Sequence, residues 1–403
     1  MIVQIVVDFF GPGAISIRAR QEVSALVAAG YDVAVITAKP SNINLERSFL
    51  EKLSAGRIQL IYLSTALEMR ARKFLGALPE VLFAARCYDA LTRLSSKESI
   101  DLIVSHAATP CYAIARFNRR RQIPTLYIIQ ALIWDRINAA ANPHSWIDTQ
   151  IYKHADGYAL VEMDYSISVS DYIRKLAIAK GANPEKAFVF YNPIDIKTFS
   201  TDSGTFPKDI DVLFVGRLSP EKGLETLIEA SQYLPEKTRM VIIGKGRLRN
   251  PLETQAQGSA CNIEFKGWID NQLLPKYLER AKLFVVPSLS EPQGVVVLEA
   301  MACGVPVIGS DVGGIPEMIR HGENGWLVQP RDASALASTI QVALSDEVVR
   351  SKAAASALET AQSFSTEWFS QRLPSFYQEL TKANRQGCIP LLEKYQTAST
   401  PLR

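Results

Sequence analysis

The chain alternates short runs of Val, Ile and Leu with longer stretches in which apolar residues recur at helical spacing. A run that is apolar throughout fits a strand buried on both faces of a parallel sheet, with helices as the crossover connections. The predicted strands are residues 2–7, 32–38, 58–63, 101–106, 125–130, 157–162 and 187–192 in the first half of the chain and 211–216, 239–244, 262–267, 283–288, 306–310 and 325–328 in the second. The pattern predicts an α/β protein with two doubly wound parallel sheets.

The stretch NPIDIKTFSTDSGTFPKDID, residues 192–211, interrupts this alternation, because it is rich in Pro, Ser, Thr, Asp and Gly and has no clear period. We therefore expect a first domain over 1–205 and a second over 206–362. Both would be Rossmann-like and would face each other across a cleft, with ligands at the carboxyl ends of the strands. The aromatic start of 363–403 predicts a helix that docks back toward the first domain, followed by a polar tail that we expect to be loosely ordered beyond about residue 385.

Length and composition narrow the class of protein. The 403 residues exceed what one core usually holds, and 47% hydrophobic with 21% charged residues indicates a folded protein. The formal net charge of +3 gives no reason to expect a nucleic-acid partner. The start MIVQIVVDFF lacks a basic region and reaches Asp8 early, which indicates a strand and not a signal peptide. With no apolar run long enough to span a membrane, we expect a cytoplasmic protein.

The cysteines and histidines lack metal-ligand spacing, so we expect reduced thiols, no metal site and no cofactor. The cysteines are Cys87, Cys111, Cys261, Cys303 and Cys388, and the histidines are His106, His144, His154 and His321.

Two turns in the second half place glycines and cations directly after a predicted strand. GRLSPEKG, residues 216–223, carries Gly216, Arg217 and Lys222, and GKGRLRN, residues 244–250, begins at Gly244. Cations beside a helix N-terminus suit a diphosphate, because fixed charge and free N–H groups both favour anions there. A solvent-exposed turn with surface charges would have the same sequence pattern.

The segment EPQGVVVLE, residues 291–299, places a glutamate inside an apolar run. A helix that begins near Gly294 and Val295 would direct its free N–H groups at an anion. Glu299 would then lie about one turn inside that helix, where a carboxylate can accept paired hydrogen bonds from a vicinal diol such as a ribose. Glu291 lies on the preceding loop, displaced toward a group beyond the phosphates, for which a sugar is the obvious candidate. Helix-dipole and structural roles for the two glutamates remain open.

With these motifs, the second half resembles the donor domain of the retaining GT-B glycosyltransferases of family 4, also called glycosyl transferases group 1. GRLSPEKG matches the family turn, and EPQGVVVLE matches its pair of glutamates with seven residues between them. EAMACGVPVIGSDVGGIPEMI with GENGWLV matches the run that follows. The resemblance implies that Arg217 and Lys222 bind the donor diphosphate, Glu299 the ribose and Glu291 the sugar. The backbone at Gly294 and Val295 would meet phosphate, and Gly216, Gly244 and Gly267 would line the donor site.

The first half resembles the family more loosely. Its glycine loop would be Gly11 and Gly13, which the resemblance adds to the donor-binding residues. Tyr31 stands where members carry His, and DLIVSH keeps only His106 of a D-x-x-H-x-H strand. YIIQALIW places Gln130 where many members carry a histidine beside the reacting sugar, and a glutamine can still hydrogen-bond a sugar hydroxyl. The resemblance makes His106 and Gln130 catalytic candidates beside Glu291, Arg217 and Lys222.

The expected activity is retaining transfer of a sugar from a nucleotide-diphosphate sugar, with UDP favoured over GDP, to a glycan, lipid-linked or small-molecule acceptor. Polysaccharide or glycoconjugate biosynthesis is the expected setting, and no metal is needed if cations and helix N-termini hold the diphosphate. Gln130 motivates an alternative, a catalytically silent nucleotide-sugar-binding protein. A nucleotide-sugar epimerase lacks the GRLSPEKG and glutamate-pair combination, and a dinucleotide oxidoreductase fits worst because the first glycines stop at GxG.

Peripheral membrane contact is a further expectation. Residues 68–94 mix Arg70, Arg72, Lys73 and Arg86 with apolar positions at helical spacing, and 116–122, RFNRRRQ, adds a basic cluster. Such segments can bind the surface of an anionic membrane, where a lipid-linked acceptor would be located, although a solvent-exposed helix face has the same composition.

Overall fold

The computed structural model describes residues 1–11, 13–40, 43–53, 57–64, 76–138, 145–199 and 207–386. Within them the chain forms two compact units. The first contains 1–134, 145–191 and 367–386, and the second contains 135–138, 192–199 and 207–366. The expected disorder beyond residue 385 falls almost wholly outside the described residues, as do Arg70, Arg72, Lys73 and Cys388.

The first unit is built on a parallel sheet whose seven described strands run in the order β3-β2-β1-β4-β5-β6-β7. The strands are nearly all buried on both faces, which is why their sequences are apolar throughout. Their bounds are β1 Ile2–Ile5, β2 Val33–Ala38, β3 Ile58–Ser64, β4 Leu102–Ser105, β5 Thr125–Ile129, β6 Tyr165–Ser168 and β7 Ala187–Val189.

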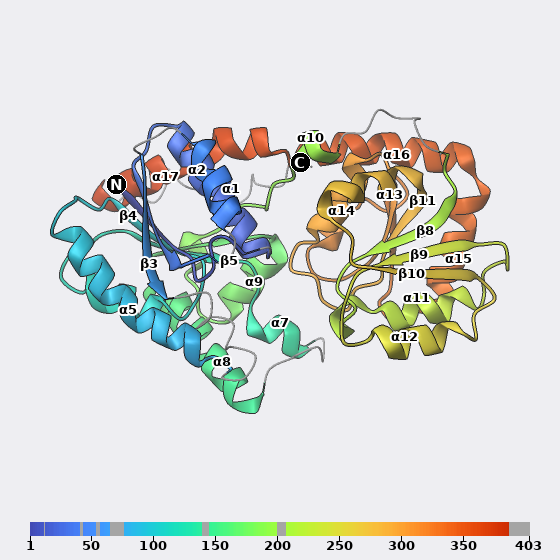
Figure 1. The fold of residues 1–403 in the computed structure, drawn as a ribbon, viewed down its shortest axis with the longest axis horizontal. Helices are drawn as coiled ribbons and strands as arrows, with labels where there is room; N and C mark the ends of the chain where they lie inside the picture. Colours follow the sequence, from blue (N-terminus) through green and yellow to red (C-terminus); the bar gives the residue numbers. More distant parts are fainter. Residues whose placement is uncertain are drawn as a thin grey trace. The chain divides into compact units, whose positions relative to one another are not determined.

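Helices cover both faces of this sheet. Their bounds are α1 Ala14–Ala28, α2 Ile43–Glu51, α5 Leu78–Ser95, α6 Cys111–Asn118, α8 Trp146–Glu162, α9 Asp171–Ala179, η1 Pro184–Lys186 and α17 Thr366–Gln386. Helix α7, Ile133–Asn138, is divided between the units, because residues 135–138 belong to the second. One core joins a face of the sheet to α1 and α17, and the other joins the opposite face to α5, α6, α8 and α9. Figure 1 shows α17 beside α1, although the two helices come from opposite ends of the chain.

The second unit repeats the plan with a parallel sheet of order β10-β9-β8-β11-β12-β13. Figure 1 shows α11 and α12 on one side of the sheet and α13, α14 and α16 on the other. Strand bounds are β8 Ile210–Val215, β9 Arg239–Ile243, β10 Asn262–Gly267, β11 Ala281–Val286, β12 Val307–Ser310 and β13 Gly325–Val328. Helix bounds are α10 Ile196–Phe199, η2 Pro220–Lys222, α11 Leu224–Ser231, α12 Arg249–Ala256, η3 Asn271–Leu273, α13 Leu274–Arg280, α14 Val295–Ala302, η4 Ile315–Glu317, α15 Ala333–Ser345 and α16 Glu347–Gln362.

One predicted strand is wrong. Residues 157–162 form the last turns of α8, which begins after the N-cap Ser145, and the strand lies further on as β6. A short apolar run cannot be told from the end of a buried helix by its periodicity. The strand itself was hidden because two of its four residues, Ser166 and Ser168, are polar and yet buried.

A buried ion pair ties the elements of the first unit together. Arg18 Nε lies 2.6 Å from Glu22 Oε1, and neither side chain is exposed. Arg18 also donates to the carbonyls of Phe190 and Tyr191, both at 2.9 Å. Tyr377 of α17 donates from its hydroxyl to Glu22 Oε2 at 2.8 Å. The pair therefore links α1 to Phe190 and Tyr191, which follow β7, and to α17.

Among the described residues, none of the helices combines the length and the apolar character that a membrane crossing requires.

We expect Arg18→Met to lower the free energy of unfolding by about 3–5 kcal/mol, because Glu22 would be left as an uncompensated buried charge. Urea denaturation followed by circular dichroism measures this. The control is Arg174→Met, which removes a partly exposed pair with Asp171 and should change stability by less than about 1 kcal/mol. Equal losses in the two variants would contradict a special role for the buried pair.

Candidate active site

The carboxyl ends of β10, β9, β8 and β11 lie in a row along one edge of the second sheet. Backbone hydrogen bonds join the turns that follow the strands: Gly216 N donates to Ile243 O at 3.0 Å, and Gly244 N donates to Gly267 O at 2.8 Å. The candidate glycines Gly216, Gly244 and Gly267 are thus brought together at the edge where ligands of such sheets bind.

Gly244 can be only a glycine in this arrangement. Its φ is 150°, and a Cβ built on it would lie 1.8 Å from the carbonyl oxygen of Gly216. Any side chain would therefore force the turns after β8 and β9 apart. This close approach explains why GKG follows a strand here.

The turn after β8 carries both candidate cations. Arg217 is largely exposed and lies 3.1 Å, Nη2 to Oε1, from Glu221. Lys222 Nζ lies 2.5 Å from Oε2 of Glu291, the residue that we expect to bind the sugar. Leu289 N donates to Glu221 O at 2.8 Å, so the turn after β8 is tied to the loop that carries Glu291.

The ion pair places Lys222 and Glu291 within reach of one ligand. Both side chains are mostly buried, and the backbone carbonyl of Glu291 accepts from Gly314 N at 2.9 Å. A cation for a diphosphate and a carboxylate for a sugar hydroxyl would have to be adjacent, because the sugar is attached to the diphosphate. The sequence could not show this contact, since 69 residues separate the two.

Helix α14 begins as the sequence predicts, with Gly294 as its N-cap and Val295 as its first residue. No side chain of the described residues caps the start of the helix, which leaves backbone N–H groups for a ligand. Glu299 follows one turn later and is half-buried. Its carboxylate has no hydrogen-bond or ion-pair partner within the described part of the chain, and burial raises its pKa to about 7.

Two residues at the same edge escaped the sequence analysis as site candidates. Lys245 lies in the turn after β9, and its Nζ is 5.3 Å from the ring centroid of Trp268, which directly follows β10. The Trp268 residue is 60% exposed. The signal that could have found it is a Trp directly after a predicted strand, because large aromatic side chains are usually buried or in contact with a ligand.

The first-unit candidates lie at carboxyl ends of the other sheet. Gly11 is in the loop after β1, and Gly13 is the N-cap of α1. Gln130 directly follows β5 and is half-buried. His106 directly follows β4, and its side chain is fully buried.

His106 belongs to the network around Glu22. Its Nε2 lies 2.6 Å from Oε1 of Gln4 and 3.5 Å from Oε2 of Glu22. Burial lowers the pKa of His106 to about 4, against the attraction of Glu22. The imidazole is therefore neutral at pH 7, and its Nδ1 is buried without a hydrogen bond among the described groups.

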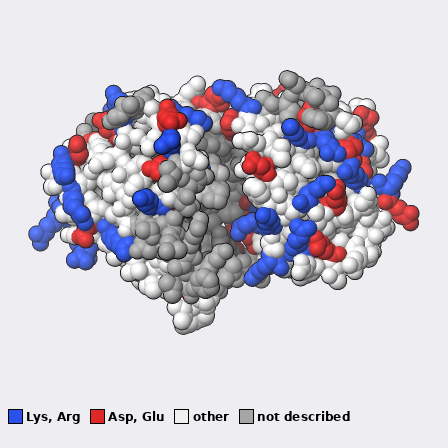
Figure 2. Space-filling view, viewed as in Figure 1, with Lys and Arg blue, Asp and Glu red and all other residues white. Residues whose placement is uncertain are grey.

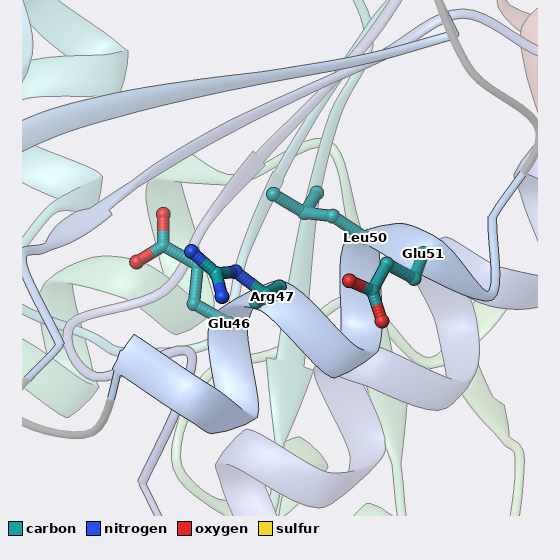
Figure 3. Close-up of a pocket in the computed structure, with 4 residues that line it drawn as sticks. All are labelled: Glu46, Arg47, Leu50 and Glu51. Atoms are coloured by element: carbon teal, nitrogen blue, oxygen red, sulfur yellow. The ribbon is translucent and has the colours of Figure 1, made fainter.

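A separate hollow lies in the first unit. It is lined by Glu46, Arg47, Leu50 and Glu51 of α2, as Figure 3 shows, and it contains none of the candidate residues. Within the described ranges, no group of three or more His, Cys, Asp or Glu side chains is arranged to hold a metal ion.

Two family models cover most of the chain. Residues 15–198 match glycosyltransferase family 4, and residues 195–361 match glycosyl transferases group 1. The chain belongs to the family 4 glycosyltransferases.

The curated relatives described here match this glycosyltransferase over only part of their own length. An uncharacterized glycosyltransferase of Methanocaldococcus jannaschii is 32% identical over 217 residues, which are 47% of this chain and 55% of the relative. The D-inositol 3-phosphate glycosyltransferase of Xylanimonas cellulosilytica is 30% identical, over 42% of each chain. The amylovoran biosynthesis glycosyltransferase AmsK of Erwinia amylovora is 34% identical, over 40% of this chain and 43% of the relative. The chain spans about half the length of these relatives.

Solved structures share the fold over nearly the whole glycosyltransferase. Sucrose-phosphate synthase from Thermosynechococcus elongatus has a TM-score of 0.78 at 23% identity, covering 95% of this chain and 99% of its own. The HepE protein of Anabaena, crystallised with UDP and glucose, has a TM-score of 0.72 at 19% identity, covering 94% and 99%. The two parallel-sheet, Rossmann-like domains of this chain are those of the GT-B fold.

We expect Glu299→Gln to stabilise this glycosyltransferase at pH 8 by about 1–3 kcal/mol and to have little effect at pH 4. The folded pKa of Glu299, about 7, lies above its usual value of 4.5, so the unfolded chain loses this proton first and stability falls as pH rises from 4.5 to 7. Glutamine removes the charge that burial penalises. Thermal and urea unfolding at both pH values measure the difference.

The matched control is Glu359→Gln on α16, an exposed glutamate of the same unit, which should change stability little at either pH. A Glu299→Gln gain that is absent at pH 8, or equally large at pH 4, would show that the carboxylate is not held unpaired.

Proposed function

We propose that this glycosyltransferase moves a sugar, with retained anomeric configuration, from a nucleoside-diphosphate sugar to its acceptor. The observation that carries the proposal is the Glu299 carboxylate, which is half-buried, unpaired among the described residues, and one turn inside a helix with an uncapped start. A buried carboxylate without a protein partner needs a donor from elsewhere. The vicinal hydroxyls of a ribose would supply two.

The remaining residues of the edge take roles that follow from their charge. Arg217, Lys222 and the N-terminus of α14 would stabilise the negative charge on the departing diphosphate, the largest single contribution such a site can make. We propose that these groups act without a metal ion. Glu291, which already bonds Lys222, would accept from a hydroxyl of the sugar.

We propose that the leaving diphosphate takes the proton of the acceptor hydroxyl while the bond from the sugar to the phosphate breaks. The acceptor oxygen then bonds to the anomeric carbon on the face that the diphosphate leaves, and this retains the anomeric configuration. Gln130 would hydrogen-bond a sugar hydroxyl. His106 is fully buried and neutral, so we assign it the positioning of Gln4 and Glu22 rather than proton transfer at pH 7.

UDP is our proposed donor nucleotide, in preference to GDP. It is supported by HepE, a protein of the same fold that was crystallised with UDP and glucose. The exposed Trp268 ring beside Lys245 offers a stacking surface at the same edge, which suits a nucleotide without selecting its base.

We propose a glycan, lipid-linked or small-molecule acceptor, in cytoplasmic synthesis of polysaccharides or glycoconjugates. The names of two relatives support this range, since one acts in amylovoran biosynthesis and the other on D-inositol 3-phosphate. The competing function is a nucleotide-sugar-binding protein without turnover, favoured by Gln130 at the strand end. Nucleotide binding without product formation from any acceptor class would select it.

We expect one of UDP, GDP, ADP and CMP to raise the melting temperature of the wild type and to raise that of Glu299→Ala by half as much or less. At a concentration of about 100 times the dissociation constant, a ligand adds about 2.7 kcal/mol, which a thermal-shift assay resolves readily. Losing hydrogen bonds to a charged group should weaken binding by about tenfold to a hundredfold. The shift should survive in Glu359→Ala, an exposed glutamate of α16. No shift with any nucleotide would overturn the donor-site assignment.

We expect turnover of the donor to be unchanged after exhaustive treatment with EDTA, because protein cations and helix N–H groups take the place of a metal ion on the diphosphate. Release of the free nucleoside diphosphate, followed with and without added Mg²⁺ or Mn²⁺, measures this. A large loss in EDTA that Mg²⁺ restores, with the protein still folded by circular dichroism, would contradict metal independence.

A further inference from the structure

The first unit exposes a cluster of large apolar side chains at the starts of two helices. Trp146 and Ile147, the first two residues of α8, are 76% and 65% exposed. Leu82 of α5 is 50% exposed, and Leu78 and Val81 on the same face are also exposed. We call these five residues the apolar tip. Leu78, Val81 and Leu82 stand at i, i+3 and i+4, so they share one side of α5.

A local contact makes the tip one surface rather than two. Ala77 N, directly before α5, donates to Asp148 Oδ1 in the first turn of α8 at 2.9 Å. The other carboxylate oxygen of Asp148 accepts from Ser145 at 2.8 Å. Gly76 has a φ of +57°, and a Cβ on it would lie 2.3 Å from Asp148 Oδ1, so the chain passes directly against this carboxylate. The two helix starts are held side by side.

Cations continue the exposed face beyond the tip. Arg86 lies one turn after Leu82 on α5 and is exposed. Helix α6 packs on α5, with Arg116 4.9 Å from the Tyr88 ring centroid. The exposed Arg119, Arg120 and Arg121 follow, and 111–124 contains no acidic residue. Figure 2 shows Lys and Arg outnumbering Asp and Glu along the outer edge of the first unit, where Figure 1 draws α5.

The span of these features selects the partner. The tip and the cations are distributed over α5, α6 and α8, and α5 alone is about 27 Å long, so together they cover more surface than one small ligand can contact. A lipid bilayer is flat and large enough to meet both at once. Its interfacial region favours Trp, and anionic headgroups attract Arg. Buried in the interface, the tip would remove from water apolar surface that the fold itself leaves exposed.

We infer that the first unit docks on an anionic bilayer through the apolar tip, with the cations of α5 and α6 on the headgroups. This docking goes beyond the proposed function and needs neither donor nor acceptor, so its test is independent of nucleotide binding. The structure adds Trp146 and Ile147, which no basic or amphipathic pattern in the sequence marked.

The test is co-sedimentation with vesicles of phosphatidylcholine, with and without phosphatidylglycerol, at low and high salt. The wild type should bind the anionic vesicles and release in high salt. Trp146→Ser with Ile147→Ser should lower the partition coefficient at least about tenfold. Replacing Arg119, Arg120 and Arg121 together by Gln should weaken binding and flatten its salt dependence.

The matched control is Val348→Ser with Val349→Ser, which also removes two exposed apolar residues from a helix start, that of α16 in the second unit. It should bind like the wild type. All variants should melt like the wild type, which separates a lost surface from a lost fold. The inference would be overturned if the control lost as much binding as the tip variants, or if the wild type did not bind. It would also be overturned if the tip variants kept vesicle binding and instead lost self-association in ultracentrifugation.

Discussion

The backbone contacts between the turns after β8, β9 and β10 are the constraint on which the rest of the candidate site depends. Gly244 lies so close to the carbonyl of Gly216 that no side chain fits between them. This approach fixes the turns that carry Arg217 and Lys245 relative to each other. Cations on separate flexible loops would move apart by repulsion, whereas cations on hydrogen-bonded strand ends are held where a polyanion can meet them all.

The two units treat a buried carboxylate in opposite ways. In the first, Glu22 accepts from Arg18 and Tyr377, and although burial acts to raise its pKa, Arg18 and His106 hold the pKa below its usual value. In the second, Glu299 has no such partner in the described chain, and burial alone raises its pKa. The first arrangement fastens helices together. The second leaves carboxylate oxygens that can accept hydrogen bonds from a ligand. A binding site requires such acceptors, whereas buried polar groups with a purely structural role are normally hydrogen-bonded within the protein.

Most strands could be predicted because parallel strands are buried on both faces. Each one is therefore apolar throughout, and this pattern is visible in the sequence without knowing which strands pair. Residues 157–162 failed because the end of a buried helix gives the same run, and β6 escaped because its serines are buried. The motifs around Arg217 and Glu299 are local, so their positions in turns and on α14 were predictable. The Lys222–Glu291 bond and the Lys245–Trp268 contact were not, because each joins residues from different strand ends that only the sheet order brings together.

Helix α17 belongs to the first unit although it is the last described helix of the chain. Phe369, Phe376 and Leu380 are among the α17 residues that complete a core whose other members come from the first half of the chain. During synthesis, one face of the first sheet would therefore emerge from the ribosome long before the helix that covers it. All the strands of the second unit, whose residues are nearly contiguous, also precede α17 in the chain. We conclude that a domain which begins folding early can finish only after α17 has been translated, and that a nascent chain ending near residue 362 would expose a hydrophobic face to chaperones.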